Sequence, residues 1–329
     1  MSNLVNMERI AEAETPAAAE APVEVSVIVT VTERPAPLAE LYGEYAAPLR
    51  SPGRPFEFLF VAAPYYRERL GALRALVAAG EPIRVLEVGQ AVGEVALLKA
   101  AAEQARGSIV LTLPAYHRIE AAALPRLLDA VTADADLVVA HRWPRQDAWT
   151  NRLQNRVLHA LVRRTVGGDL HDLGCGVRAI RRSVLRELPL YGDASRFLPL
   201  IAQREGFRVA EVQAPQHPKD RPPRLYAPGI YVRRLIDILG MYFLFRFREK
   251  PLRFFGLVGA VVGVLGFVIL AVLTAQWLGG RSMAERPLLL LGVLLLVLGV
   301  QSLSLGLVGE IMVNLHASRN PMYRVRRGE

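Results

Sequence analysis

VEVSVIVTV, at residues 23–31, decides the fold because it is the first of several short apolar runs separated by helical stretches. Its β-branched residues predict a buried strand. Further strands are predicted at residues 56–62, 83–88, 108–113 and 136–140, and helices at residues 38–45, 66–79, 93–106 and 124–132. This alternation is typical of an α/β fold with a mainly parallel sheet covered on both faces. Ligands of such sheets bind beyond the carboxyl ends of the strands.

Two long segments without charged residues, 254–278 and 287–309, lie toward the end of the chain. Each is long enough to cross a hydrocarbon core of roughly 30 Å as a helix, and the short linker predicts a two-helix transmembrane hairpin. Basic residues are more frequent outside the pair than in the linker. This pattern favours a multi-pass protein of the inner membrane with both termini in the cytoplasm. A pair of buried core helices is the alternative.

Composition limits the partners. The net charge of +9 over 329 residues suits phosphorylated substrates and anionic lipid headgroups. Zinc-finger spacing and basic repeats interleaved with aromatic residues are missing, so nucleic acid is not expected. The single cysteine, Cys175, excludes an intrachain disulfide and a cysteine-based zinc cluster.

Three further segments flank the predicted domains. Residues 1–22 are rich in Ala, Glu and Pro, and we expect a disordered tail. Residues 229–250 mix arginines with apolar side chains, which predicts a helix in the membrane interface or an ordinary amphipathic core helix. Residues 314–329 read as a basic cytoplasmic tail.

HDLGCGVRAIRR, at residues 171–182, is the most distinctive polar stretch. Its glycines permit a sharp turn between Asp172 and Arg178. A carboxylate before such a turn and arginines after it could order a phosphate site, because planar guanidinium groups suit phosphate oxygens. The alternative is a loop followed by a helix with solvated arginines. His117 and His171 have no metal-ligand partner at a regular spacing, so we interpret both as structural or surface residues.

The order of these landmarks resembles the family 2 glycosyltransferases that act on polyprenyl phosphates, such as dolichol-phosphate mannose synthases and undecaprenyl-phosphate sugar transferases. The resemblance covers residues 23–327. Its most specific parts are RQDAW at 145–149, HDLGCGVRAIRR, RFLP at 196–199, GFRVAEV at 206–212, GE at 309–310 and PMYRVR at 321–326.

This resemblance implies a GT-A, Rossmann-like domain over residues 23–228, interface helices over 229–250 and a membrane hairpin within 251–313. It also implies a nucleotide sugar as donor, a polyprenyl phosphate as acceptor, and Mg²⁺ or Mn²⁺ as cofactor, with transfer at the cytoplasmic face. Membrane lipid is a further partner. A homo-oligomer and a subunit of a larger membrane complex both stay open.

The chain departs from the family at its acidic motifs. Only Glu33 is kept from the motif that ends the first strand. The aspartate pair after the second strand falls on Ala62 and Ala63, and the family's Asp-x-Asp falls on Pro114 and Tyr116. Because Mg²⁺ and Mn²⁺ prefer hard oxygen ligands, no residue of this chain is assigned as a metal ligand.

The site residues follow from the resemblance. Arg142 and Arg156 fall at positions that contact the acceptor phosphate, and Asp172 is an acid that could orient the arginines or accept a cation. The predicted substrate-binding residues are Glu33, Arg178, Lys219, Arg224 and Tyr226.

Two functions are weighed from these residues. The first is a membrane-bound transferase that moves a sugar onto a polyprenyl phosphate. A phosphate oxygen is already an anion, so this reaction needs positioning and stabilisation of the leaving diphosphate more than it needs a base. The alternative is a degenerate pseudo-glycosyltransferase that serves as a lipid-phosphate-binding, regulatory or structural membrane subunit.

Overall fold

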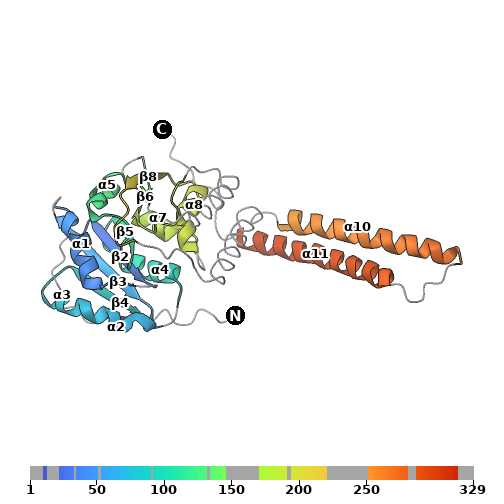
Figure 1. The fold of residues 1–329 in the computed structure, drawn as a ribbon, viewed down its shortest axis with the longest axis horizontal. Coiled ribbons are helices and arrows are strands. Elements are labelled where there is room, and N and C mark those ends of the chain that lie inside the picture. Colours follow the sequence, from blue (N-terminus) through green and yellow to red (C-terminus); the bar gives the residue numbers. More distant parts are fainter. Residues whose placement is uncertain are drawn as a thin grey trace. The chain divides into compact units, whose positions relative to one another are not determined.

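The computed structural model describes residues 10–12, 22–32, 35–50, 53–89, 92–131, 134–145, 170–190, 194–220, 251–280 and 287–317. The chain divides into two units, Met1–Leu225 and Tyr226–Glu329, and each is described by itself. The first unit contains the sheet and the second contains two long helices (Figure 1).

The first unit is built on a sheet of eight strands in the order β1-β4-β3-β2-β5-β7-β6-β8. Strands β4, β3, β2 and β5 run parallel, as do β6 and β8, whereas β7 is antiparallel to both of its neighbours. The mainly parallel sheet is therefore confirmed. The strands are β1 (Ile10–Glu12), β2 (Val25–Val31), β3 (Phe56–Ala62), β4 (Ile83–Val88), β5 (Ile109–Pro114), β6 (Leu137–Arg142), β7 (Arg178–Arg181) and β8 (Val209–Ala214).

Helices cover both faces of this sheet. The helices on one face are α1 (Leu38–Arg50), α3 (Arg74–Ala78) and α5 (Leu124–Asp129), and those on the other are α4 (Glu94–Gln104), α7 (Arg182–Glu187) and α8 (Leu198–Arg204). Every residue of β2 is buried, and its alternate side chains belong to the two cores. Burial on both faces explains why this strand is rich in β-branched residues and why even its Ser26 and Thr30 are buried.

Some elements differ from the prediction. The helix expected at residues 66–79 is a series of short turns: η1 (Pro64–Tyr66), α2 (Arg67–Leu70), η2 (Gly71–Leu73) and α3. Gly71 lies at the junction of α2 and η2, where a glycine would destabilise a continuous helix. Strand β1 lies within residues 1–22, the segment expected to be disordered, yet it pairs with β4. That expectation is therefore wrong for residues 10–12.

The described part of the second unit contains α10 (Pro251–Leu278) and α11 (Pro287–Ala317), which pack against each other. The two backbones come close at Gly299, where an added Cβ would lie 2.6 Å from the Cα of Gly263. Small residues allow membrane helices to approach in this way. The Glu310 carboxylate accepts a hydrogen bond from the backbone N–H of Leu252 (3.3 Å), near the start of α10.

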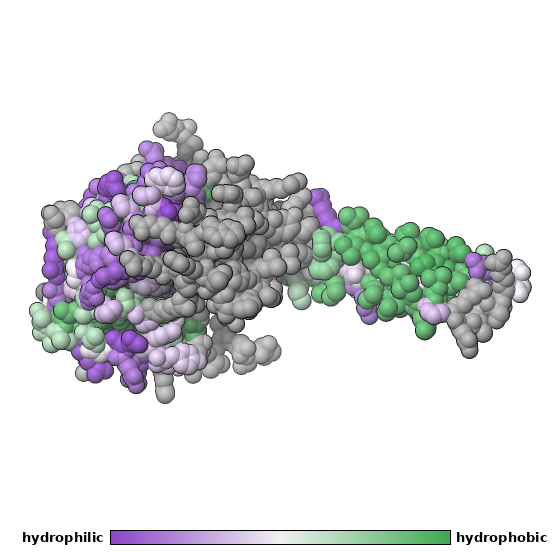
Figure 2. Space-filling model, in the orientation of Figure 1, coloured by the Kyte–Doolittle hydropathy of each residue, from purple (hydrophilic) through white to green (hydrophobic). Residues whose placement is uncertain are grey.

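Both helices are long and apolar enough to span a membrane, and most of their residues are exposed within the structure. Figure 2 shows hydrophobic side chains over α10 and α11, in contrast to the mixed surface of the described part of the first unit. The alternative of two buried core helices is therefore wrong.

Candidate active site

The strand order indicates where a ligand would bind. β3 lies on one side of β2 and β5 on the other, so the chain reverses its direction of winding between β2 and β5. Parallel sheets bind ligands outside the carboxyl ends of the strands at such a point. Here Thr30 of β2 pairs with Pro114 of β5, and the backbone N–H of Ala36 donates to the carbonyl of Ala115 (2.8 Å).

The ends of β3 and β5 carry no acidic side chain of their own among the described residues, whereas Glu94 of α4 accepts a hydrogen bond from Thr30 at the end of β2 (3.4 Å). β3 ends at Ala62, which is buried, and β5 ends at Pro114. Tyr116 follows two residues later. Neither alkyl side chains nor a proline ring can ligate Mg²⁺ or Mn²⁺, and a neutral phenol is a poor ligand for them. These positions therefore do not fit the metal that the family implies.

A cation, Arg118, lies where the acids are missing. Its guanidinium carbon is 5.1 Å from the centre of the Tyr116 ring, a cation–π arrangement. Its Nε donates to the carbonyl of Cys175 (3.1 Å), its Nη2 donates to the carbonyl of Gly174, and its Nη1 lies 3.3 Å from a carboxylate oxygen of Asp220. Burial opposes its charge, but Tyr116 and Asp220 raise the pKa of Arg118, so it stays a cation.

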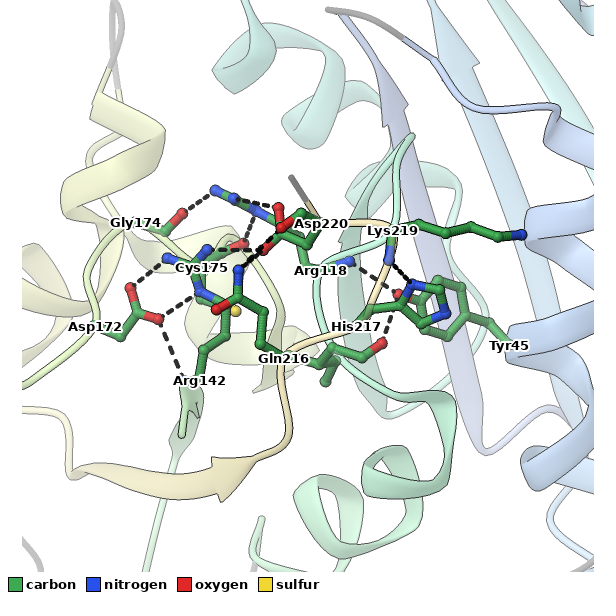
Figure 3. A network of polar contacts seen from close by, with 11 residues as sticks. Tyr45, Arg118, Arg142, Asp172, Gly174, Cys175, Gln216, His217, Lys219 and Asp220 are labelled. Carbon is green, nitrogen blue, oxygen red and sulfur yellow. Dashed lines mark hydrogen bonds and ion pairs between the residues drawn. The ribbon is translucent and has the colours of Figure 1, made fainter. Parts of the chain in front are cut away.

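Arg118 belongs to a buried network of alternating charges (Figure 3). Arg142, at the end of β6, makes a bidentate pair with Asp172, with Nε–Oδ2 at 2.7 Å and Nη2–Oδ1 at 3.0 Å. Its Nη1 bonds Asp220 (3.0 Å), which also accepts a hydrogen bond from Gln216 (3.0 Å). Arg142 is 3% exposed and Asp172 is 1% exposed.

The network fixes the charge of its members. Burial would raise the pKa of Asp172, but its hydrogen bonds and attraction to Arg142 lower it below the ordinary range. Burial also works against the charge of Arg142, and Asp172 raises the pKa of Arg142 well above its usual value. Asp172 therefore holds Arg142 in one orientation, and the role of Asp172 at the site stays a prediction. All three nitrogens of Arg142 face carboxylates, and its contact with a lipid phosphate stays a prediction.

Of the predicted substrate-binding residues, the two that the structure describes, Arg178 and Lys219, make no ion pair with this network. Arg178 is 3% exposed on β7, and its Nε has no hydrogen-bond partner among the described residues. Burial lowers the pKa of Arg178, partly offset by Glu94. Lys219 pairs with Glu40 of α1 at the surface. Four predicted residues lie outside the described part of the chain: Glu33, Arg156, Arg224 and Tyr226.

Two histidine clusters escaped the sequence reading because their members come from distant segments. In the first, Glu44 of α1 lies between His117 (3.0 Å) and His217 (2.8 Å). The ligand-type atoms of this group lie within 4.8 Å of one another, close enough to hold a metal ion. However, Nδ1 of His217 accepts the backbone N–H of Lys219 (3.0 Å), which places the proton of a neutral ring on Nε2, facing Glu44. The His217 ring is thus satisfied, whereas Nε2 of His117 is buried and makes no hydrogen bond among the described residues.

The second cluster lies beside Asp172. Nδ1 of His171 is 2.8 Å from Oε2 of Glu211, and the backbone N–H of His171 donates to the other oxygen of that carboxylate (2.6 Å). The ring of His141 stacks on the ring of His171, with centroids 5.3 Å apart. Glu211 thereby holds the chain that leads into Asp172, which agrees with a structural interpretation of His171.

A family model described as "Glycosyl transferase family 2" matches residues 26–189, which contain the strand ends and most of the network. The chain belongs to glycosyl transferase family 2. The matched range begins at the second residue of β2 and contains strands β3 to β7.

Curated relatives extend the family match along the chain. "Dodecaprenyl-phosphate galacturonate synthase" of Rhizobium johnstonii is 26% identical over 75% of both chains. "Undecaprenyl-phosphate 4-deoxy-4-formamido-L-arabinose transferase" of Edwardsiella ictaluri is 28% identical over 89% of both chains. The enzyme of that name from Pseudomonas paraeruginosa is 29% identical over 89% of this chain and 86% of its own.

Solved structures confirm the GT-A fold of this family member. Glucosyl-3-phosphoglycerate synthase from Mycobacterium tuberculosis, crystallised with Mn²⁺ and UDP-glucose, has a TM-score of 0.51 and 18% identity over 67% of this chain and 79% of its own. At this identity the likeness concerns the fold alone. With its two exposed apolar helices, the family member is a membrane protein.

Proposed function

We propose that this family 2 glycosyltransferase transfers a sugar from a nucleotide sugar to a polyprenyl phosphate at a membrane. The observation that carries the proposal is the extent of the similarity to undecaprenyl-phosphate sugar transferases, which covers 89% of the chain. An alignment of that length must include parts of both units, so the apolar helices and the sheet domain are shared together. A transferase domain joined to a membrane anchor suits a lipid acceptor, because the anchor keeps the domain beside the bilayer that holds that acceptor.

The finer parts of the proposal rest on the sequence. Basic residues flank the outer ends of α10 and α11, which supports a multi-pass inner-membrane protein with its sheet domain and both termini in the cytoplasm. Nucleotide sugars would then reach the carboxyl edge of the sheet from the cytoplasm. The domain limits predicted above, with an interface helix at 229–250, belong to the same proposal.

The chemistry needs few groups. An oxygen of the lipid phosphate attacks the sugar carbon, the bond from that carbon to the diphosphate breaks, and its electron pair leaves with the diphosphate. No proton has to move, because the attacking oxygen is already an anion. Asp172 and Asp220 hold Arg142 in one orientation, and Arg156 is the second cation that the family positions at the acceptor. Residues 62–63 and 114–116 do not fit the family's metal, and no step is assigned to it.

Purified full-length protein in lipid nanodiscs tests this proposal. It would be incubated with undecaprenyl phosphate and a panel of radiolabelled nucleotide sugars, followed by extraction into organic solvent. We expect one sugar to appear in the lipid fraction only when the acceptor lipid is present. Absence of label with every sugar, from protein that still melts cooperatively, would contradict a transferase.

The missing acids favour a second candidate, a lipid-phosphate-binding subunit without turnover. The same nanodiscs distinguish it, because binding of undecaprenyl phosphate without labelled product would support the subunit and exclude the enzyme.

A further inference from the structure

The carboxyl end of β5 lacks acids, but it is not neutral. The guanidinium of Arg118 lies over the Tyr116 ring, next to the position where the family has its Asp-x-Asp. It is therefore a cation that belongs to the protein itself, at the strand end where the fold places its ligand.

We propose that Arg118 binds the diphosphate of the nucleotide sugar in place of a divalent cation, so that transfer proceeds without metal. This inference rests on the proposed function. As the bond between the sugar carbon and the diphosphate oxygen breaks, its electron pair adds charge to the diphosphate, and the N–H groups of Arg118 stabilise that charge. The acceptor oxygen forms the new bond to the sugar carbon, and no proton or redox partner is needed.

Arg118 suits this role better than Arg142 does. The nitrogens of Arg142 face two carboxylates, at 2.7 to 3.0 Å, and its side chain is 3% exposed. Arg118 is 16% exposed, and its only carboxylate partner among the described residues is Asp220, at 3.3 Å. Its other two contacts are to neutral carbonyls. A guanidinium has five N–H donors, and these three contacts engage one nitrogen each. Arg118 therefore keeps donor capacity and positive charge for an anion.

The surroundings hold this cation in place before any ligand arrives. The carbonyls of Gly174 and Cys175 fix two nitrogens of Arg118, and the carbonyl of Gly176 in the same loop accepts a hydrogen bond from the Thr112 hydroxyl of β5 (3.1 Å). Donors that are already oriented stabilise developing charge at little reorganisation cost. Arginine also recognises phosphate oxygens in a bidentate manner, which a lysine cannot do.

Activity in the presence of EDTA is the first test. We expect wild-type transfer to be unchanged after chelation, and Arg118→Gln to lower kcat by roughly 100-fold, the loss typical of removing one preorganised donor. Arg126→Gln is the matched control, because Arg126 donates to the carbonyl of Gln213 (3.3 Å) away from β5. Loss of wild-type activity in EDTA, restored by Mg²⁺ or Mn²⁺, would overturn the inference and leave the proposed function standing.

Rebuilding the acids separates an electrostatic role from a structural one. In the Arg118→Gln background, Pro114→Asp with Tyr116→Asp is expected to restore transfer only when Mn²⁺ is added. A residue that merely pins the 174–176 loop would show no such dependence. Recovery that ignores Mn²⁺ would contradict the exchange of arginine for metal.

Binding of UDP and GDP to the full chain in EDTA, measured by calorimetry, is independent of turnover. We expect one of them to bind wild type, Arg118→Gln to weaken it more than 10-fold, and Arg118→Lys to keep part of the affinity. If transfer fails with every sugar but this pattern holds, the proposed function is wrong and the diphosphate role of Arg118 stands. If neither nucleotide binds without metal, the inference is wrong.

Discussion

Two stretches of the sheet's carboxyl edge differ in how they treat charge. The acid-free edge comprises residues 62–63 and 114–116 at the ends of β3 and β5, where small or neutral side chains replace the family's carboxylates. The ion-paired edge comprises Arg142 at the end of β6 together with Asp172 and Asp220, all buried. The acid-free edge has lost the family's carboxylates, whereas the ion-paired edge has two carboxylates, which are sufficient to neutralise Arg142.

The difference shows that the two edges are not independent. Arg118 follows the acid-free strand end in the chain, yet it reaches Asp220 in the ion-paired edge. Buried charges are stable only when they are paired. The chain Asp172, Arg142, Asp220, Arg118 satisfies this condition and ends on a cation beside Tyr116. Substitutions in the ion-paired edge should therefore cost far more stability than substitutions in the acid-free edge.

The largest effect is expected for Arg142→Met. Removing this side chain leaves Asp172 and Asp220 buried without their main partner, which typically costs about 3–5 kcal/mol of unfolding free energy. Denaturant unfolding of the full chain in detergent would measure it. The control is Arg54→Met, because Arg54 pairs with the exposed Asp129 (2.6 Å), and such surface pairs contribute about 1 kcal/mol or less.

A double variant sharpens that result. Arg142→Met with Asp172→Leu removes both charges of the bidentate pair, so we expect it to regain part of the lost stability. Equal losses for Arg142→Met and Arg54→Met would show that the buried network is not under electrostatic constraint.

The loop that joins the two edges should respond at an intermediate level. Gly176 has φ of +80°, whereas a Cβ there would meet only Pro114 at 3.9 Å. Gly176→Ala should therefore cost about 1–2 kcal/mol through its left-handed backbone and not through a clash. Gly174→Ala is the control, since its Cβ would make ordinary contacts and its φ is not left-handed. A smaller loss for Gly176→Ala than for Gly174→Ala would contradict this explanation.

The acid-free edge should tolerate change. Tyr116→Leu keeps an apolar side chain and removes the ring beneath Arg118, so we expect a loss of about 0.5–1 kcal/mol. Tyr65→Leu, at a side chain that is 78% exposed, should have a smaller effect. A loss as large as that of Arg142→Met would remove the contrast between the edges.

The sequence predicted the elements whose patterns are local. The β-branched runs gave β2 to β6, and the uncharged segments gave α10 and α11. Strand β7, by contrast, reads RAIR and lies in the middle of the sheet. Its two apolar residues are too few to produce a strand signal, since tertiary burial and not local propensity makes it a strand. The same limit explains why HDLGCGVRAIRR was expected to be a site or a loop followed by a helix, without a strand.

For the site, the motif residues were accessible to sequence reasoning, but their pairing was not. The resemblance pointed to Arg142 and Asp172, thirty residues apart, and the structure joins them directly. Asp220 and Arg118 were overlooked because neither matches a residue of the family's motifs. The available signal was weak. It was an arginine two residues beyond the lost Asp-x-Asp, whose positive charge could take the place of the missing metal cation.

The smallest expected effect concerns how the stability of the fold depends on pH through the cluster of Glu44, His117 and His217. Burial lowers the pKa of His117, an effect that His217 and Lys219 increase and that Glu44 and Glu40 oppose. The folded protein therefore binds this proton less tightly than the unfolded chain does, whose pKa is about 6.5. Stability from the neutral ring is present above that pH and is lost as pH falls below it, by at most about 1.4 kcal/mol per pH unit for one proton.

We expect His117→Gln to reduce the difference in unfolding free energy between pH 7 and pH 5. Asp172, with its lowered pKa, loses its contribution only at lower pH and does not disturb this window. An unchanged difference would show that His117 is protonated equally in both states and that Glu44 outweighs its burial.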